Sequence, residues 1–120
     1  MTQHERRQPE EWDAELDGVI AAPNSHVPVY ENDHLRVLAV TMQPSAREPL
    51  HHHARRSTFL VINSAPLRYY NSDGTYFDIP KREVSAQAPY KEELEPERLH
   101  SVENLSSEDT YFALRIEYKN

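Results

Sequence analysis

Three consecutive histidines, His51 to His53, stand just ahead of a run that is typical of a β-strand. Because side chains alternate along a strand, His51 and His53 are expected to point to one side and His52 to the other. Two neutral imidazoles on one strand can bind a single metal ion, and a third ligand from another strand would complete the site. Such a pair is also found at solvated strand ends, so the pair alone leaves both interpretations open.

His100, which precedes a turn and the final predicted strand, is available as the third ligand and favours the metal site. His52 is expected to face away from the metal as a surface or sheet-packing residue. Glu95 and Glu97 lie near His100 in the sequence and could supply a carboxylate, but a solvated loop position is the favoured interpretation for each. The remaining histidines of the β region are expected to be structural or exposed: His26 and His34.

A ligand pocket also needs polar groups that orient the ligand. Arg68 and Tyr70 lie two residues apart on one predicted strand, so they face the same side. If that side is the interior, Arg68 would bind a carboxylate or phosphate and Tyr70 could act as an acid, which makes them the candidate catalytic residues. The favoured alternative is an outward Arg68 paired with an acidic residue on a neighbouring strand. Further polar candidates for the pocket are Arg47, Tyr76, Tyr90 and Arg98.

The elements that must position these residues are short runs rich in Val, Ile, Thr, Tyr and Phe, separated by turn signals. Their spacing predicts an all-β sandwich or barrel, and Asn71-Ser72-Asp73-Gly74 predicts a hairpin. Residues 81–98 are interpreted as a strand followed by an exposed loop. In the last strand the alternation is read as Phe112, Leu114 and Ile116 inward, with Tyr111, Arg115 and Glu117 outward. The predicted strands cover residues 27–32, 35–42, 57–63, 66–71, 75–80 and 110–118.

Residues 1–26 differ from the rest and are expected to form an N-terminal arm, followed by a β-barrel domain over residues 27–120. Within the arm, residues 7–18 predict a short helix with Pro9 in its first turn and Gly18 as its C-terminal cap. Trp12 and Leu16 would share one face of this helix. That stripe is too short to hold a helix alone, so it should dock on the domain or on another subunit, and we expect a homodimer.

The composition narrows the class of protein. The chain has 120 residues, a formal net charge of −7 and no cysteine, which suits one domain and excludes disulfides and zinc–thiolate sites. An acidic chain lacks the basic surface of a nucleic-acid-binding protein, so no nucleic-acid partner is expected. No apolar stretch is long enough to span a membrane and the N-terminus has no apolar signal segment, so we expect no membrane partner and a cytoplasmic location.

The segment around the histidine pair resembles the first motif of the cupins, which runs Gly, five residues, His-x-His, three or four residues, Glu, six residues, Gly. His51 and His53 match the histidine pair, and Ser45 takes the position of the first glycine. Ser57 or Thr58 falls where the glutamate stands, and Ser64 or Ala65 where the last glycine stands.

The second motif of that family runs Gly, five residues, Pro-x-Gly, two residues, His, three residues, Asn. Pro96, His100 and Asn104 match it in kind. Arg98 replaces a glycine, and one residue is missing before His100; alternatively the count is kept and Glu95 takes the proline position. The resemblance extends over residues 27–118.

This resemblance implies a cupin barrel, a double-stranded β-helix (jelly roll) of two antiparallel sheets. It also implies one divalent metal ion, Fe, Ni, Mn or Zn, bound by His51, His53 and His100. The glutamate ligand does not carry over, and a three-histidine site without a carboxylate is similar to that of the cupin thiol dioxygenases.

Two classes of function follow from the resemblance. One is a metal-dependent dioxygenase, isomerase or lyase that acts on a small organic metabolite by oxygenation, isomerisation, cyclisation or elimination. The other is a non-catalytic module that binds a small molecule or serves as a structural dimer unit, with an empty or degenerate metal site. The sequence alone leaves the choice open.

Overall fold

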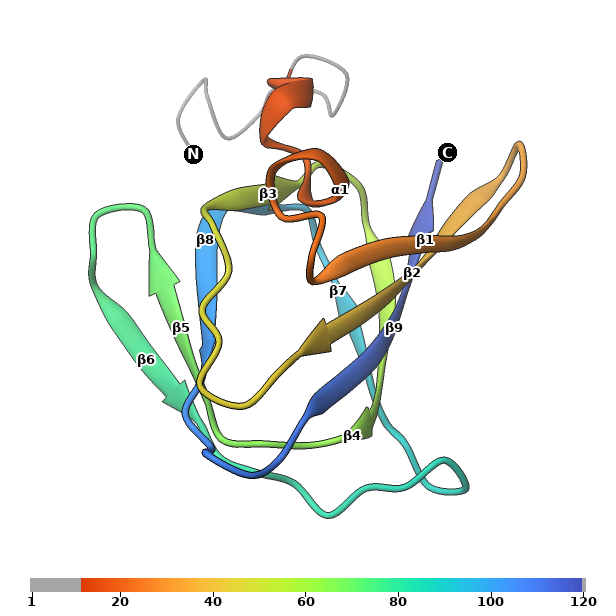
Figure 1. Ribbon diagram of the computed structural model, residues 1–120. Coiled ribbons are helices and arrows are strands. Elements are labelled where there is room, and N and C mark those ends of the chain that lie inside the picture. The colour runs from red at the N-terminus through yellow and green to blue at the C-terminus, as the bar shows by residue number, and fades with distance from the viewer. Residues whose placement is uncertain (1–11, 120) are drawn as a thin grey trace.

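The computed structural model describes residues 12–119, which form nine strands in two antiparallel sheets (Figure 1). The five-stranded sheet has the order β1-β2-β9-β4-β7, and the four-stranded sheet has the order β3-β8-β5-β6. The predicted all-β fold with two antiparallel sheets is therefore confirmed. The strands are β1 His26–Glu31, β2 Leu35–Met42, β3 His51–His53, β4 Ser57–Asn63, β5 Leu67–Asn71, β6 Tyr76–Ile79, β7 Tyr90–Leu94, β8 Glu97–Asn104 and β9 Tyr111–Tyr118.

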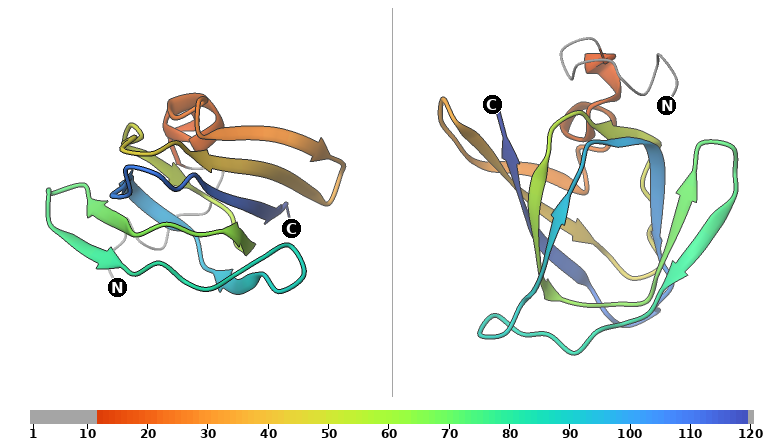
Figure 2. Two further views of the ribbon diagram at one scale, coloured as in Figure 1. Left: turned by 60° about the horizontal axis from the view of Figure 1, so that its bottom comes forward. Right: turned by 180° about the vertical axis from the view of Figure 1, so that it is seen from behind.

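The two sheets curve toward each other around a central space, as Figure 1 and the views of Figure 2 show. Apolar side chains from both sheets pack at one end of this space and form the core. The opposite end, where β3 meets β8, is covered by the short N-terminal helix (Figure 1). The core residues are Leu38, Val40, Met42, Val61, Ala65, Leu67, Tyr111 and Ala113.

The hairpin that connects β5 and β6 forms at the turn predicted from the sequence. The Asn71 amide donates to the Thr75 carbonyl at 2.8 Å, and the Gly74 amide donates to the Asn71 carbonyl at 3.0 Å. Gly74 has φ 90°, a left-handed conformation that glycine adopts without steric cost. The turn thereby fixes the register that pairs Tyr70 with Tyr76.

The interpretation of residues 81–98 as a strand followed by a loop is wrong in its order. An irregular segment comes first, β7 follows at Tyr90–Leu94, and β8 already begins at Glu97. Strand β7 lies at the edge of its sheet and exposes Lys91, Glu92 and Glu93. Because one side of an edge strand is solvated, its sequence lacks the alternation by which the other strands were found.

The side-chain directions expected for β9 are also wrong. Tyr111, Ala113, Arg115 and Glu117 are buried, while the residues between them are only half buried. Alternation separates two faces of a strand without saying which is inside. Here the inner face carries charged side chains that are stabilised by partners on other strands, and the more apolar face is the outer one.

The N-terminal helix also differs from the expectation. Residues 1–11 lie outside the described residues, so the predicted helix over 7–18 is only described from Trp12 onward. There the chain forms a 3₁₀ turn, η3 Ala14–Leu16, and a single helical turn, α1 Gly18–Ala21. Gly18 begins α1 and is buried, and it is not a C-terminal cap. No helix within residues 12–119 is long and apolar enough to cross a membrane.

Candidate metal centre

Strands β3 and β8 bring the three histidines proposed as ligands together. His51 is paired directly with His100, and His53 with Glu97. The ring centroid of His51 lies 4.9 Å from that of His53 and 4.4 Å from that of His100. The ring centroids of His53 and His100 are 5.4 Å apart. All three side chains are almost completely buried. The segments that match the two motifs therefore meet at one point of the fold.

His52 points away from this cluster, as the alternation predicts. Its ring packs edge-on against Trp12, with 5.0 Å between the ring centroids. It lines a separate surface pocket that is also lined by Asp17, Arg36 and Glu117. His52 is itself buried, at 6% exposed, and packs beneath the N-terminal segment on the side of β3 opposite the cluster.

His26 is a member of the cluster that sequence reasoning missed. It is the first residue of β1, and its ring lies 4.6 Å from that of His51 and 5.0 Å from that of His53 between centroids. One potential ligand atom from each of these three histidines lies within 4.8 Å of the others. The sequence around His26 does not indicate this position, because the folding of β1 against the other strands brings His26 to the cluster.

Hydrogen bonds to the main chain orient two of the rings. His51 Nδ1 lies 2.8 Å from the Pro49 carbonyl, and His100 Nδ1 lies 2.7 Å from the Arg98 carbonyl. A carbonyl only accepts, so Nδ1 carries the proton and donates it, and Nε2 is left with a free lone pair. This arrangement is typical of histidines that bind metal ions.

The cluster keeps its histidines neutral. Burial, with smaller contributions from the neighbouring histidines and Arg115, lowers the pKa of His51 to about 2 and that of His26 to about 4. Burial also lowers the pKa of His53 and of His100. Because only a neutral imidazole can bind a metal ion, these shifts keep the donor atoms available well below neutral pH.

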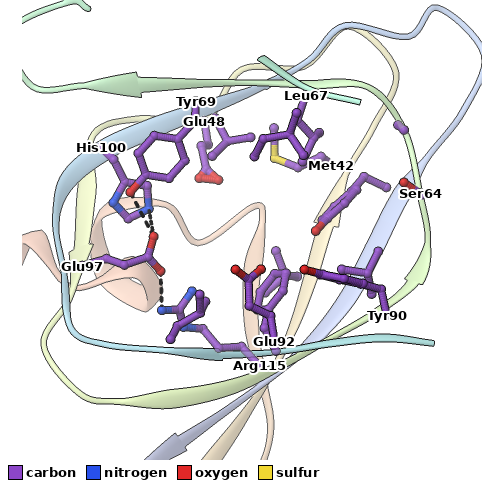
Figure 3. Close-up of a pocket in the computed structure, with 18 of the residues that line it drawn as sticks. Met42, Glu48, Ser64, Leu67, Tyr69, Tyr90, Glu92, Glu97, His100 and Arg115 are labelled. Atoms are coloured by element: carbon purple, nitrogen blue, oxygen red, sulfur yellow. Dashed lines mark hydrogen bonds and ion pairs between the residues drawn. The ribbon is translucent and has the colours of Figure 1, made fainter. Parts of the chain in front are cut away.

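Glu97 lies inside the site, so its interpretation as a solvated loop residue is wrong. It begins β8, and one potential ligand atom each of His53, Glu97 and His100 lies within 4.8 Å of the others. Arg115 Nη2 donates to its Oε1 at 2.6 Å, and the Tyr69 hydroxyl donates to its Oε2 at 2.9 Å (Figure 3). Burial raises the pKa of Glu97, but Arg115, His100 and these hydrogen bonds outweigh burial and lower it overall.

Glu48 is a second carboxyl group that sequence reasoning did not find. It is 7% exposed, and its Oε2 lies 3.2 Å from His51 Nε2. Burial, reinforced by the negative charge of Glu97, raises the pKa of Glu48 to about 8. Its position three residues before His51 is the one signal in the sequence, since a chain that turns into β3 can bring the two side chains together.

Arg68 and Tyr70 lie on the outer face of the four-stranded sheet, because Leu67 and Tyr69 take the inner positions of β5. Arg68 donates to both carboxylate oxygens of Asp78 on β6, at 2.7 and 3.0 Å, and Tyr70 donates to Glu103 at 2.7 Å. Neither lines the cavity. The structure therefore agrees with the outward interpretation of Arg68, and it does not bring either residue to the histidines.

Other positions of the two cupin motifs are informative as well. Ser45, which stands in place of the first glycine, has φ 64°, so the backbone keeps the left-handed conformation that a glycine would adopt freely. Ser57, one of the two candidates for the glutamate position, is 1% exposed. Asn104 is buried and donates to the carbonyls of Met42 and Asp109, which indicates a structural role.

A cavity of about 540 Å³ extends from the histidines between the two sheets. Glu97, His100 and Arg115 lie toward one end of it, Ser64, Tyr90 and Glu92 lie toward the other, and Met42 and Leu67 lie on its apolar wall (Figure 3). A partly apolar cavity with a few convergent polar groups is the usual form of a small-molecule site.

No family model matches the chain, and no curated protein matches it. Several solved structures do. A cupin domain from Bordetella pertussis is 16% identical with a TM-score of 0.67, over 79% of this chain and 92% of that chain. A double-stranded β-helix protein from Klebsiella pneumoniae is 14% identical with a TM-score of 0.56, over 98% and 90%. The polyketide cyclase RemF from Streptomyces resistomycificus is 12% identical with a TM-score of 0.54, over 79% and 64%.

Proposed function

We propose that this chain, which has the cupin fold, is a metal-dependent enzyme for a small organic metabolite and holds one divalent ion through His51, His53 and His100. The observation that carries the proposal is the convergence of these buried rings, two of which are turned by main-chain carbonyls so that Nε2 is free. Two groups of described residues each bring one ligand atom per residue within 4.8 Å of the others. They are His26, His51 and His53, and His53, Glu97 and His100; they share His53, so His26 and Glu97 are candidates for a further ligand.

The donor set fits such an ion. His51 Nε2, His53 Nδ1 and Glu48 Oε2 are buried and make no hydrogen bond to residues 12–119: Glu48 Oε2 and His51 Nε2 face each other at 3.2 Å, and Glu117 Oε2 lies 3.5 Å from His53 Nδ1. Leaving buried polar atoms unpaired costs free energy, and a cation bound at the cluster would offset part of that cost. Imidazole suits Fe, Ni and Zn, and a carboxylate adds affinity for Mn. The proposal therefore keeps these four metals as candidates.

The surrounding residues would hold the ligands in place. Tyr69 stacks on His100 with 4.8 Å between centroids and an angle of 7° between the rings, and its hydroxyl fixes Glu97. Arg115 fixes the other oxygen of Glu97. The apolar wall around Met42 and Leu67 would exclude water from a bound metabolite. A divalent ion at this site would supply Lewis-acid chemistry.

The type of reaction is left open among oxygenation, isomerisation, cyclisation and elimination. One of the similar structures is described as a polyketide cyclase, which supports keeping cyclisation among them. The similarity is at the level of the fold, and fold alone does not specify a reaction.

A second candidate function is a binding module without catalysis. It is favoured by the state of Glu97, whose two oxygens are already engaged by Arg115 and Tyr69, so that this carboxylate is not free to bind a metal. The apolar outer face of β9, with Phe112, Leu114 and Ile116 half buried, favours a homodimer in either case.

Metal analysis tests the proposal. The protein should be purified without added metal, and then titrated with Fe(II), Ni(II), Mn(II) and Zn(II) in separate anaerobic samples. We expect about one equivalent of one of these ions, lost on treatment with a chelator. A chain that retains no metal and binds none on titration would instead be the non-catalytic module.

A further inference from the structure

The cavity is divided into a polar end and an apolar body. The polar end holds the histidine cluster together with Glu48, Glu97 and Arg115. The walls beyond it are formed mainly by aliphatic and aromatic side chains, together with Ser64, Arg82 and Glu92, and the aromatic ring of Phe77, which is 52% exposed, lies at the boundary with solvent. These walls are Val40, Met42, Phe59, Val61, Leu67, Phe77, Ile79 and Val102.

Among residues 12–119, Arg115 is the one arginine at the polar end, and its hydrogen bonding is incomplete. The residue is 3% exposed, and Nη2 donates to Glu97 at 2.6 Å. Its Nε is buried without a hydrogen-bonding partner among the described residues. A buried guanidinium is costly unless its donors are matched, and its planar fork suits a carboxylate. Arg115 lines the cavity, and Nη2 to Glu97 is the one hydrogen bond of its guanidinium to a described residue, so the cavity side of the group can receive a second anion.

The charges that line the cavity lead to the same conclusion. Arg115 balances Glu97, and Arg82 balances Glu92. Even with Glu48 ionised, a bound divalent ion would leave the cavity with a net positive charge. An anionic ligand would neutralise that charge, whereas a neutral or cationic ligand would not.

We propose that the cavity takes an apolar, aromatic carboxylate, whose carboxylate group is received by Arg115 beside the histidine cluster and whose body lies against the apolar walls. The inference rests on the proposed function, since the same cavity holds the metal centre. A volume of about 540 Å³ is in the range of sites that enclose a compact organic ligand, so a bicyclic acid is a suitable probe.

Binding of matched probes tests the inference. Calorimetric titrations compare 2-naphthoate with its neutral amide, 2-naphthamide, and with acetate, which lacks the apolar body. Metal-loaded protein is used, with the metal content of each sample measured beforehand. We expect 2-naphthoate to bind at least tenfold more tightly than either of the others. Equal affinities for acid and amide, or no binding of 2-naphthoate at millimolar concentration, would overturn the inference.

Variants assign the preference to Arg115. The double variant Arg115→Met/Glu97→Gln removes both charges together, so neither is left buried and unpaired. Its ratio of affinities for acid and amide should fall to about one. Arg115→Lys keeps the charge without the fork and should reduce the preference several-fold. Arg68→Met, which removes an arginine–carboxylate pair on the outer face, should leave it unchanged. A preference that survives in both Arg115 variants would overturn the inference.

The two proposals fail separately. One equivalent of metal without any preference for the acid would contradict this inference and leave the metal centre standing. If no metal binds, the same titrations on the metal-free protein decide: a preference that depends on Arg115 would support the ligand class while the proposed enzyme fails.

Discussion

Replacing Gly18 by alanine would test how tightly the N-terminal helix packs on the histidine cluster. Gly18 begins α1, and a Cβ atom at this position would lie 2.8 Å from His53 Cε1, 3.2 Å from His26 Cδ2 and 3.3 Å from His51 Cδ2. Favourable carbon–carbon contacts are about 3.5 to 4.0 Å, so the nearest ring must move by roughly 0.7 Å or more. His53 is 1% exposed and has little room to move.

The expected magnitudes follow from this clash. Overpacking typically costs about 1 to 3 kcal/mol, and the higher helix propensity of alanine returns up to about 1 kcal/mol, so the net change should be a loss of stability of about 0 to 3 kcal/mol. Metal–ligand distances tolerate about 0.2 Å, so displacement of His53 should weaken metal binding about ten- to a hundredfold.

Urea unfolding and metal titration of Gly18→Ala measure the two effects. Gly74→Ala is the matched control, because Gly74 lies in a turn with φ 90° and a Cβ there would meet open space. The control should lose stability through its backbone conformation and keep its metal affinity. If Gly18→Ala binds metal as tightly as the parent chain, the packing of α1 on the cluster is not what holds the rings in place.

Three further predictions concern pH, ligand orientation and assembly. In the metal-free protein the pKa of His26 is lowered to about 4, so the unfolded chain binds more protons and stability falls as pH drops from about 6.5. The pKa of Glu48 is raised to about 8, so the folded chain binds more protons and stability falls as pH rises from about 4.5 to 8. Unfolding free energy should therefore decline above pH 6.5, by up to about 2 kcal/mol at pH 8, and Glu48→Gln should abolish this decline; a decline that persists in the variant would refute the assignment. Tyr69→Phe removes a hydrogen bond to a charged group and should cost about 1.5 to 3 kcal/mol in urea unfolding, with weaker metal binding; unchanged values would mean that the hydroxyl does not hold Glu97. Light scattering should give the mass of a dimer, and Leu114→Asp on the outer face of β9 should give a monomer; a parent chain of monomer mass would contradict the predicted assembly.

Much of the fold could be predicted because it depends on local signals. Period-two runs and turn residues located most strands, and the Asn71–Gly74 segment specified its hairpin. Strand β7 was misplaced because an edge strand with charged residues carries no such pattern. Which face of β9 is inside could not be predicted, since Arg115 is stabilised by Glu97 and Glu117 by Arg36, partners that lie far away in the sequence.

The candidate site was predictable where one strand or one motif holds the residues. His51 and His53 share a face by alternation, and His100 follows from the second motif. His26 reaches the cluster from the start of β1. Glu97 enters it because β8 begins at Glu97, whereas the sequence analysis predicts a loop through residue 98. Pairing between strands that are distant in the sequence decides both positions, and the local sequence does not indicate it.

The most direct test of the metal centre is the metal content of two single variants measured side by side. His53 lies in the cluster and His52 faces the opposite side of the same strand, so the two variants each remove one histidine of β3 but only one of them removes a side chain that points to the site. Elemental analysis after titration with one divalent ion should show about one equivalent in the parent chain and in His52→Ala, and close to none in His53→Ala. Equal metal content in the two variants would contradict the account.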